Sequence, residues 1–329
     1  MNCVVTGAAG FIGSHLFDYL ILQKHEVHGL DSYAIGRYKH QWIKKIDLLD
    51  KERVDQFVRE YQPEILYHLA AFAHEGLSQF CPLLITENNY NAYLNILVPA
   101  IKYGVKRIIL CSSMSVYGNQ EPPFNELMPR KPQDVYAISK TAMEEVTEIL
   151  AKVYGFEYVI IRPHNVYGSR QGLYDPYRNV VGIFINRLLA RKPFYIYGDG
   201  EQRRAFSYID DVVPYLAKAG FADVSREIIN IGPNEEYTIN YLASELLKHF
   251  PDSPKPIHLP DRPLEVKDAW CDNFKAEVLL DYKTSVTFEE GIAEMVKWAK
   301  KVGHQKPQYL MELELVTGTT PETWVNKLL

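Results

Sequence analysis

Short apolar runs and amphipathic stretches alternate along the first half of the chain. The apolar, often β-branched runs cover residues 3–6, 27–31, 65–69, 107–112 and 158–162, and helical patterns cover residues 14–23, 51–61, 83–103 and 137–154. A repeated order of strand, helix and strand places the strands parallel, with helices on both faces of the sheet. The pattern therefore predicts an α/β fold with a doubly wound parallel sheet.

The alternation loosens after residue 163, where proline and glycine become denser. Further helices are expected near residues 177–191, 211–221, 238–249 and 288–302. We expect residues 1–165, joined by parts of 206–232, to form the sheet domain. Residues 166–205 and 233–302 are expected to form a smaller mixed α/β domain, and residues 303–329 a C-terminal tail whose role the sequence does not indicate.

Composition narrows the class of protein further. The chain has 329 residues and a net charge of −5, and its basic residues form only short pairs such as Lys44-Lys45, which argues against a nucleic-acid partner. No apolar run is long enough for a membrane span, and no signal peptide is visible. The four scattered cysteines lack metal-ligand spacing. We therefore expect a cytoplasmic protein without a metal site.

A glycine turn follows the first strand directly. Gly7, Gly10 and Gly13 lie three residues apart, and a helix whose first turn lacks side chains presents free N–H groups and a positive dipole end to phosphate. Asp31 ends the second strand, where a carboxylate reaches the ribose hydroxyls of a dinucleotide. The pattern predicts a dinucleotide site. Asp31 favours NAD over NADP, although Arg37 nearby leaves NADP open.

A second group of residues is expected at the same edge of the sheet. Tyr136 and Lys140 are four apart on a predicted helix and so share a face, and Ser113 follows the strand 107–112. Lowering the pKa of a tyrosine from about 10 to about 7 takes roughly 4 kcal/mol. One cation about 4 Å away supplies about that much at an effective dielectric near 20. Lys140 is therefore sufficient to activate Tyr136 as a base.

The combined motifs resemble a known family. TGAAGFIGSHL, HLAAFA, SSMSVYG, YAISK, RPHNVYG and YGDGEQRRAFSYIDD occur in the order and spacing typical of the extended short-chain dehydrogenase/reductases that act on nucleotide sugars. The likeness runs from residue 1 to about 302 and is strongest to the UDP-glucose 4-epimerases. It implies a Rossmann fold, NAD as cofactor, a UDP-sugar as substrate, and a homodimer built through the helices at 83–103 and 137–154.

The resemblance also implies roles for individual residues. The catalytic group is Ser113, Tyr136 and Lys140. The cofactor positions, which include Tyr136 and Lys140, are Gly7, Gly10, Phe11, Ile12, Gly13, Asp31, Asp47, Leu48, Leu69, Ala70, Ala71, Asn89 and Pro163. The substrate positions, in addition to Ser113, are Asn165 and the two arginines Arg204 and Arg262 for the diphosphate, Tyr197 for the nucleobase, and Ala269 beside the sugar.

Members of this family share a keto-sugar intermediate and differ in the later fate of that intermediate. The 4,6-dehydratases carry a Thr-Asp-Glu run where this chain has Ser113, Met114 and Ser115, and glucuronate decarboxylases carry a glutamate at Ser115. Neither Met114 nor Ser115 can act as an acid or base at neutral pH. The expected activity is therefore 4-epimerisation, in which hydride returns to the opposite face of the 4-keto sugar.

Two departures from the family pattern bear on the substrate. Ala205 stands where the family has an aspartate between Arg204 and Phe206, and Ala269 replaces a tyrosine of some 4-epimerases. The small Ala269 leaves room for an N-acetyl group at C2, so N-acetylated sugars are a hypothesis beside plain ones. Other epimerase, dehydratase or ketoreductase outcomes, and a non-catalytic NAD-binding sensor or scaffold, remain alternatives.

Overall fold

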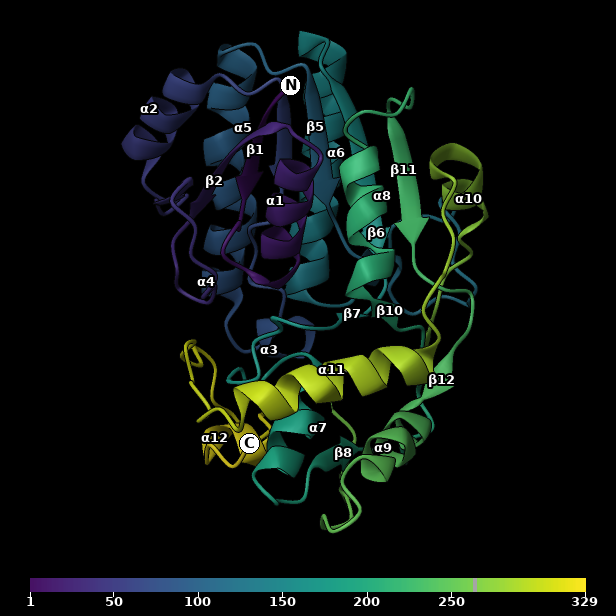
Figure 1. The fold of residues 1–329 in the computed structure, drawn as a ribbon. Helices are drawn as coiled ribbons and strands as arrows, with labels where there is room; N and C mark the ends of the chain where they lie inside the picture. Colours follow the sequence, from purple (N-terminus) through teal and green to yellow (C-terminus); the bar gives the residue numbers. More distant parts are fainter. Residues whose placement is uncertain (263–264) are drawn as a thin grey trace.

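A seven-stranded sheet forms the upper part of the molecule in Figure 1. The computed structural model describes residues 1–262 and 265–329. Every neighbouring pair of strands in this sheet is parallel. The strands in spatial order are β11 (Glu227–Ile231), β6 (Glu157–Pro163), β5 (Arg107–Cys111), β4 (Ile65–His68), β1 (Asn2–Thr6), β2 (Glu26–Asp31) and β3 (Ile43–Lys45).

Helices cover both faces of this sheet, as the alternating pattern predicts. One face packs against α1 (Phe11–Leu22), α8 (Val213–Lys218) and α10 (Phe274–Leu280). The other packs against α2 (Lys51–Tyr61), α5 (Ala92–Lys102) and α6 (Val135–Tyr154). The doubly wound α/β fold is confirmed.

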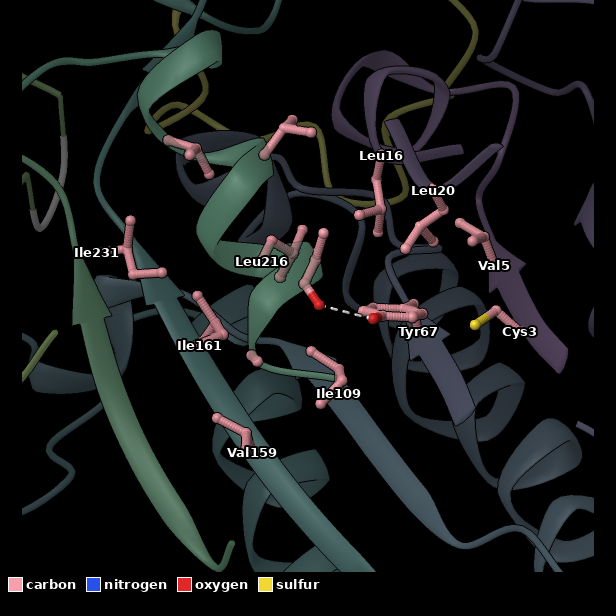
Figure 2. Close-up of a cluster of buried hydrophobic side chains, with 14 of the residues drawn as sticks. Cys3, Val5, Leu16, Leu20, Tyr67, Ile109, Val159, Ile161, Leu216 and Ile231 are labelled. Carbon is pink, nitrogen blue, oxygen red and sulfur yellow. Dashed lines mark hydrogen bonds between the residues drawn. The ribbon is translucent and has the colours of Figure 1, made fainter. Parts of the chain in front are cut away.

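The core on the α1 side consists of alternate residues of each strand. Figure 2 shows Cys3, Val5, Ile109, Val159 and Ile161 facing Leu16, Leu20 and Leu216. Tyr67 is also fully buried there, and its hydroxyl donates a 2.9 Å hydrogen bond to the carbonyl of Ala217 in α8. This bond satisfies the one polar atom that the ring brings into the apolar layer.

The smaller lower part has a core of its own. It is built from α7 (Val180–Leu189), α9 (Ile239–Lys248) and α11 (Phe288–Val302), with β8 (Tyr195–Tyr197) paired to β13 (Ile257–Leu259). Three short strands, β12 (Tyr237–Thr238), β9 (Arg203–Arg204) and β14 (Asp268–Ala269), form a second sheet, and β7 (Val166–Tyr167) pairs with β10 (Ser207–Tyr208). The tail carries α12 (Glu322–Val325).

Most predicted elements are present, within a few residues at their ends. The pattern missed β3, which has only one buried residue, and β11, which follows a stretch without clear periodicity. The helix predicted over residues 83–103 is interrupted. It comprises α4 (Pro82–Thr86), a π-helical turn over Glu87–Asn91, and α5, while the short α3 (Glu75–Ser78) precedes it. Throughout the described part of the chain, no helix has the length and apolar character needed to cross a membrane.

Candidate active site

A large cavity lies where the two parts of the molecule meet, at the carboxyl ends of the sheet strands. Its volume is about 790 Å³, and its wall draws on both parts: Gly7, Asp31 and Ser113 from the sheet, and Tyr197 and Arg204 from the smaller part. The carboxyl edge of an open parallel sheet is where such folds bind ligands.

The glycine turn Gly7–Gly13 lines one part of this cavity. Gly7 has φ +66°, and a Cβ there would lie 2.8 Å from the amide nitrogen of Ala70. A Cβ on Gly13 would lie 2.1 Å from the carbonyl oxygen of Gly7, so the turn closes this tightly only with glycine. Gly10 caps α1 without a side-chain hydrogen bond, which leaves the N–H groups of the first turn free for a ligand.

Asp31 sits beside this turn at the end of β2. Its carboxylate accepts hydrogen bonds from the backbone N–H groups of Ala9, at 3.0 Å, and Tyr33, at 2.6 Å. Burial raises the pKa of Asp31, and the two backbone hydrogen bonds oppose that rise. A diphosphate on the α1 terminus and a ribose at Asp31 therefore fit the residues present.

The sequence leaves NADP open as the cofactor because of Arg37, but in the structure this side chain is bound by other protein groups. Its guanidinium donates to the carbonyls of Tyr33 and Gly36 and to the side chain of Gln308, and it lies over the ring of Tyr174.

The other predicted cofactor positions follow the same wall, with one exception. Phe11, Ile12, Asp47, Leu48, Leu69, Ala70, Ala71 and Pro163 line the cavity. Asn89 is fully buried. Among the described residues, its neighbour Asn88 lines the cavity and Asn89 does not. The Asn89 amide accepts from the N–H of Phe72 at 2.8 Å and donates to Ser139 at 3.1 Å. In this structure Asn89 therefore fixes the loop after β4 against α6.

The structure brings Ser113, Tyr136 and Lys140 together on the cavity wall. Tyr136 and Lys140 lie one turn apart on α6, and the Lys140 ammonium is 5.8 Å from the centre of the Tyr136 ring. The Lys140 Nζ donates a 2.7 Å hydrogen bond to the carbonyl of Cys111 at the end of β5. Burial lowers the pKa of Lys140 to about 8. Ser113, two residues beyond β5, is the N-cap of the 3₁₀ turn Met114–Tyr117.

Two charged residues that the sequence analysis did not identify face this group. Burial raises the pKa of Tyr136 well above its ordinary value, the carboxylate of Glu75 raises it further, and the guanidinium of Arg178 opposes the rise. Glu75 and Arg178 both line the cavity, and no hydrogen bond or ion pair joins either side chain to the described residues. Two charges of opposite sign, Glu75 and Arg178, thus act on the pKa of the Tyr136 hydroxyl in opposite directions.

Arg204 and Arg262, the two arginines predicted to bind the diphosphate, both lie close to Glu265, which the sequence analysis did not identify. Arg262 pairs with both oxygens of Glu265, at 3.0 and 2.8 Å, and its guanidinium lies 4.8 Å from the ring centre of Tyr197. Arg204 is 3.9 Å from the same carboxylate and donates to the carbonyl of Lys267 at 2.7 Å. Glu265 therefore neutralises part of the charge of this arginine pair.

The remaining substrate positions also lie near this group. Asn165 lines the large cavity, and its amide donates a 2.9 Å hydrogen bond to the carbonyl of Ala205. Ala269 is buried and lines a smaller adjoining cavity of about 90 Å³, which also borders Ser115, Glu75, Arg204 and Arg262.

Sequence signals for the missed residues are weak but present. Glu75 is a lone acid a few residues beyond the carboxyl end of β4, and Arg178 is the one basic residue in the stretch LYDPYRNV. A charge at the ligand-binding edge of a parallel sheet favours a functional role, but the fold must be known before that edge can be located. No spacing rule connects Glu75 with Arg178.

Comparisons with known proteins agree with this geometry. Residues 3–232 match the model of the NAD dependent epimerase/dehydratase family. A UDP-N-acetyl-alpha-D-glucosaminuronate decarboxylase of Bacillus cytotoxicus is 31% identical over 92% of this chain and 98% of its own. The UDP-glucose 4-epimerase of Thermotoga maritima, solved with UDP-glucose, is 33% identical, with a TM-score of 0.88 over 92% of this chain and 99% of its own.

A third relative was solved with the cofactor. The UDP-glucose 4-epimerase of Thermus thermophilus, in complex with NAD, is 32% identical, with a TM-score of 0.86 over 91% of this chain and 98% of its own. The glycine turn, Asp31 and the group around Tyr136 thus occur in a chain that matches such relatives almost from end to end. The chain belongs to the NAD dependent epimerase/dehydratase family, and its cofactor is NAD.

Proposed function

We propose that this protein is a nucleotide-sugar 4-epimerase that acts on UDP-sugars of the glucose and galactose type. The observation that carries the proposal is the convergence of Ser113, Tyr136 and Lys140 on the cavity that the glycine turn enters. Met114 and Ser115, beside this group, offer no acid or base at neutral pH. That combination supports proton and hydride transfer at one sugar carbon without elimination or decarboxylation.

Each catalytic side chain has a definite task in this proposal. Tyr136 takes the proton of the C4 hydroxyl as that carbon is oxidised, and Ser113 hydrogen-bonds to the same oxygen. The positive charge of Lys140 stabilises the Tyr136 anion. Bound NAD supplies the hydride acceptor and, after the 4-keto sugar has turned, the hydride donor. Tyr136 then returns its proton to the C4 oxygen, which completes the inversion.

The residues that bind the nucleotide end of the substrate are assigned from the positions they share with the family pattern. Tyr197 faces the nucleobase, and Asn165, Arg204 and Arg262 hold the diphosphate, for which a planar guanidinium is well suited. Release of Glu265 from Arg262 accompanies diphosphate binding in this scheme, because the two anions compete for one guanidinium. Ala269 leaves space beside the sugar, so the proposal includes N-acetylated UDP-hexoses.

A second candidate, a UDP-hexuronate as the substrate, is favoured by Arg178. Its guanidinium faces Tyr136 and Lys140 and lowers the pKa of both, although burial dominates each pKa. A half-buried cation without a described protein partner favours an anionic group on the ligand, and a C6 carboxylate would supply one. The Bacillus cytotoxicus relative is named for an acidic sugar. The reaction would still be 4-epimerisation, because Ser115 replaces the decarboxylase glutamate.

The test uses the purified protein without added cofactor. We expect denaturation to release NAD, and we expect interconversion at C4 with UDP-glucose, UDP-galactose or their N-acetyl counterparts. UDP-glucuronate is tested alongside them. Tyr136→Phe should lower kcat by about 10²–10⁴-fold, the usual contribution of a general base. Tyr154→Phe, at the exposed end of the same helix, is the matched control and should leave kcat unchanged.

The outcomes separate the candidates. Turnover of neutral UDP-hexoses that is lost in Tyr136→Phe supports the first proposal. Turnover of UDP-glucuronate alone, lost in Arg178→Gln, favours the second candidate. Bound NAD without turnover of any of these sugars overturns both.

A further inference from the structure

The C-terminal tail, residues 303–329, is anchored to the sheet part of the molecule. The N–H groups of Glu314 and Leu315 donate to the carbonyl of Phe80 at 2.8 and 3.0 Å. The Glu314 carboxylate accepts from the backbone N–H groups of Leu83 and Leu84, at 2.9 and 2.8 Å. These N–H groups open α4, so the carboxylate satisfies donors that a helix start leaves free.

The same tail is anchored to the smaller part. Asn186 of α7 and the backbone of Gln305 exchange two hydrogen bonds of 2.9 Å. Arg187, the next residue of α7, donates to the carbonyl of Leu328 at 2.9 Å. Figure 1 shows the tail in yellow, with α12 and the C-terminus beside α7 and below α3. The tail therefore spans the junction in which the cavity lies.

Trp324 places the tail in the cavity wall itself. Its side chain is only 3% exposed and packs edge-on against Phe80 and Tyr177, with ring centres 5.7 and 5.5 Å away. It also borders both the large cavity and the adjoining one. A Cβ built on Gly76 would lie 3.5 Å from the Trp324 ring and 3.4 Å from the Arg262 guanidinium, so both side chains border Gly76.

Thr323 contacts the other residue assigned to the nucleotide. Its hydroxyl shares a 2.7 Å hydrogen bond with the hydroxyl of Tyr197, whose ring lies under the Arg262 guanidinium. Thr323 thus holds Tyr197 by a hydrogen bond, and Trp324 borders Gly76 and both cavities together with Arg262. The relatives described above leave 8–9% of this chain unmatched, a share comparable in length to the tail.

We propose that the tail is part of the nucleotide-sugar site and that Thr323 and Trp324 are positioning residues for the nucleoside diphosphate. They act through Tyr197 and Arg262 and leave the chemistry at Tyr136 untouched. This inference rests on the proposed function, because that function assigns the nucleotide to Tyr197 and Arg262. It adds a segment outside the family-matched region 3–232 to the determinants of substrate affinity.

The test measures UDP binding, which needs no turnover. The NAD-loaded holoenzyme is titrated calorimetrically with UDP and with UDP-glucose, for the unaltered protein and for Thr323→Val, Thr323→Ser and Trp324→Leu. We expect Thr323→Val and Trp324→Leu to raise Kd for both ligands on the order of tenfold, as loss of a buried anchor does. Thr323→Ser keeps the hydroxyl and should restore the unaltered Kd. Val325→Ala, at a half-exposed neighbour, is the matched control.

Kinetics and cofactor content separate positioning from unfolding. Thr323→Val should raise KM for the sugar nucleotide while kcat and the bound NAD per chain stay unchanged. An unchanged Kd in Thr323→Val and Trp324→Leu overturns this inference and leaves the proposed function standing. An equal loss of affinity in Thr323→Val and Thr323→Ser also overturns this inference, because the hydroxyl of residue 323 would then not determine ligand binding. Absence of UDP binding by the unaltered holoenzyme overturns the proposed function together with this inference.

Discussion

Burial sets the proton affinity of the Tyr136 hydroxyl first, and nearby charges of opposite sign adjust it. Burial raises the pKa of this tyrosine, and the Glu75 carboxylate adds to the rise. Glu75 is exposed to the cavity, and partial desolvation there raises its own pKa, which the nearby guanidinium of Arg204 opposes. Burial and the charge of Glu75 also raise the pKa of Asp134, the N-cap of α6, to about 7. A change at Glu75 is therefore expected to alter the pH dependence of the reaction.

We expect Glu75→Gln to move the acid limb of the pH profile of kcat/KM to lower pH. Removing a negative charge that faces Tyr136 lowers the pKa of its hydroxyl, so the base form is available at lower pH. The measurement is the profile between about pH 5 and pH 9 with the UDP-sugar that the turnover assay shows to be the substrate. Glu87→Gln, an exposed glutamate beyond α4, should leave the profile in place. A shift of the Glu75→Gln limb to higher pH would contradict the assignment.

At the scale of elements, α6 depends on a buried ion pair one turn beyond Lys140. Glu144 is fully buried and accepts from Arg162 of β6 at 2.9 and 2.5 Å. Ser112 and Arg130 donate to the same carboxylate at 2.5 and 2.6 Å. Burial raises the pKa of Glu144, but Arg162, Ser112 and Arg130 together outweigh burial and hold that pKa below the ordinary value. The network ties the helix that carries Tyr136 to the ends of β5 and β6.

We expect Glu144→Gln to lower the free energy of unfolding by about 3–5 kcal/mol, because it leaves the guanidinium of Arg162 buried without its counter-charge. Urea denaturation of the NAD-loaded protein measures this. Glu145, at the next position of the same helix, makes no side-chain ion pair within the described chain. Its substitution Glu145→Gln should therefore change the free energy of unfolding by less than about 0.5 kcal/mol. A similar small loss in both variants would mean that the pair is not what holds α6 in place.

The elements whose pattern is strong were predictable from sequence, and the contacts between distant segments were not. Five buried strands, the glycine turn and the helix carrying Tyr136 and Lys140 have local signals, because periodicity and spacing are properties of neighbouring residues. β3, with one buried residue, has no such signal. The position of Trp324 and Arg262 around Gly76, and of Arg178 near Tyr136, depends on how the two parts pack, which no local pattern encodes.

At the scale of the whole molecule, α5 and α6 leave apolar side chains uncovered. The two helices lie side by side, joined by a 2.6 Å hydrogen bond between the hydroxyls of Tyr93 and Thr147. Leu97 is buried in the protein's own core, and Ile101 and Val146 pack partly against it, whereas Ile149 is 58% exposed. Ile138 and Val153 share the face of Ile149 and are 54% and 66% exposed. A second copy of the chain would cover this row.

We therefore predict a homodimer that uses this face, as the family resemblance implies. Exposed apolar side chains gathered on one helix face are typical of interfaces. Light scattering coupled to size exclusion should give twice the chain mass of 37.9 kDa for the unaltered protein. The double variant Ile149→Glu and Val153→Glu should give the single mass, because two buried charges would face their own copies across the two-fold axis. Leu127→Glu, at a fully exposed position outside these helices, should remain dimeric. A monomeric unaltered protein, or a dimer that survives the double variant, would place the subunit contact elsewhere or remove it.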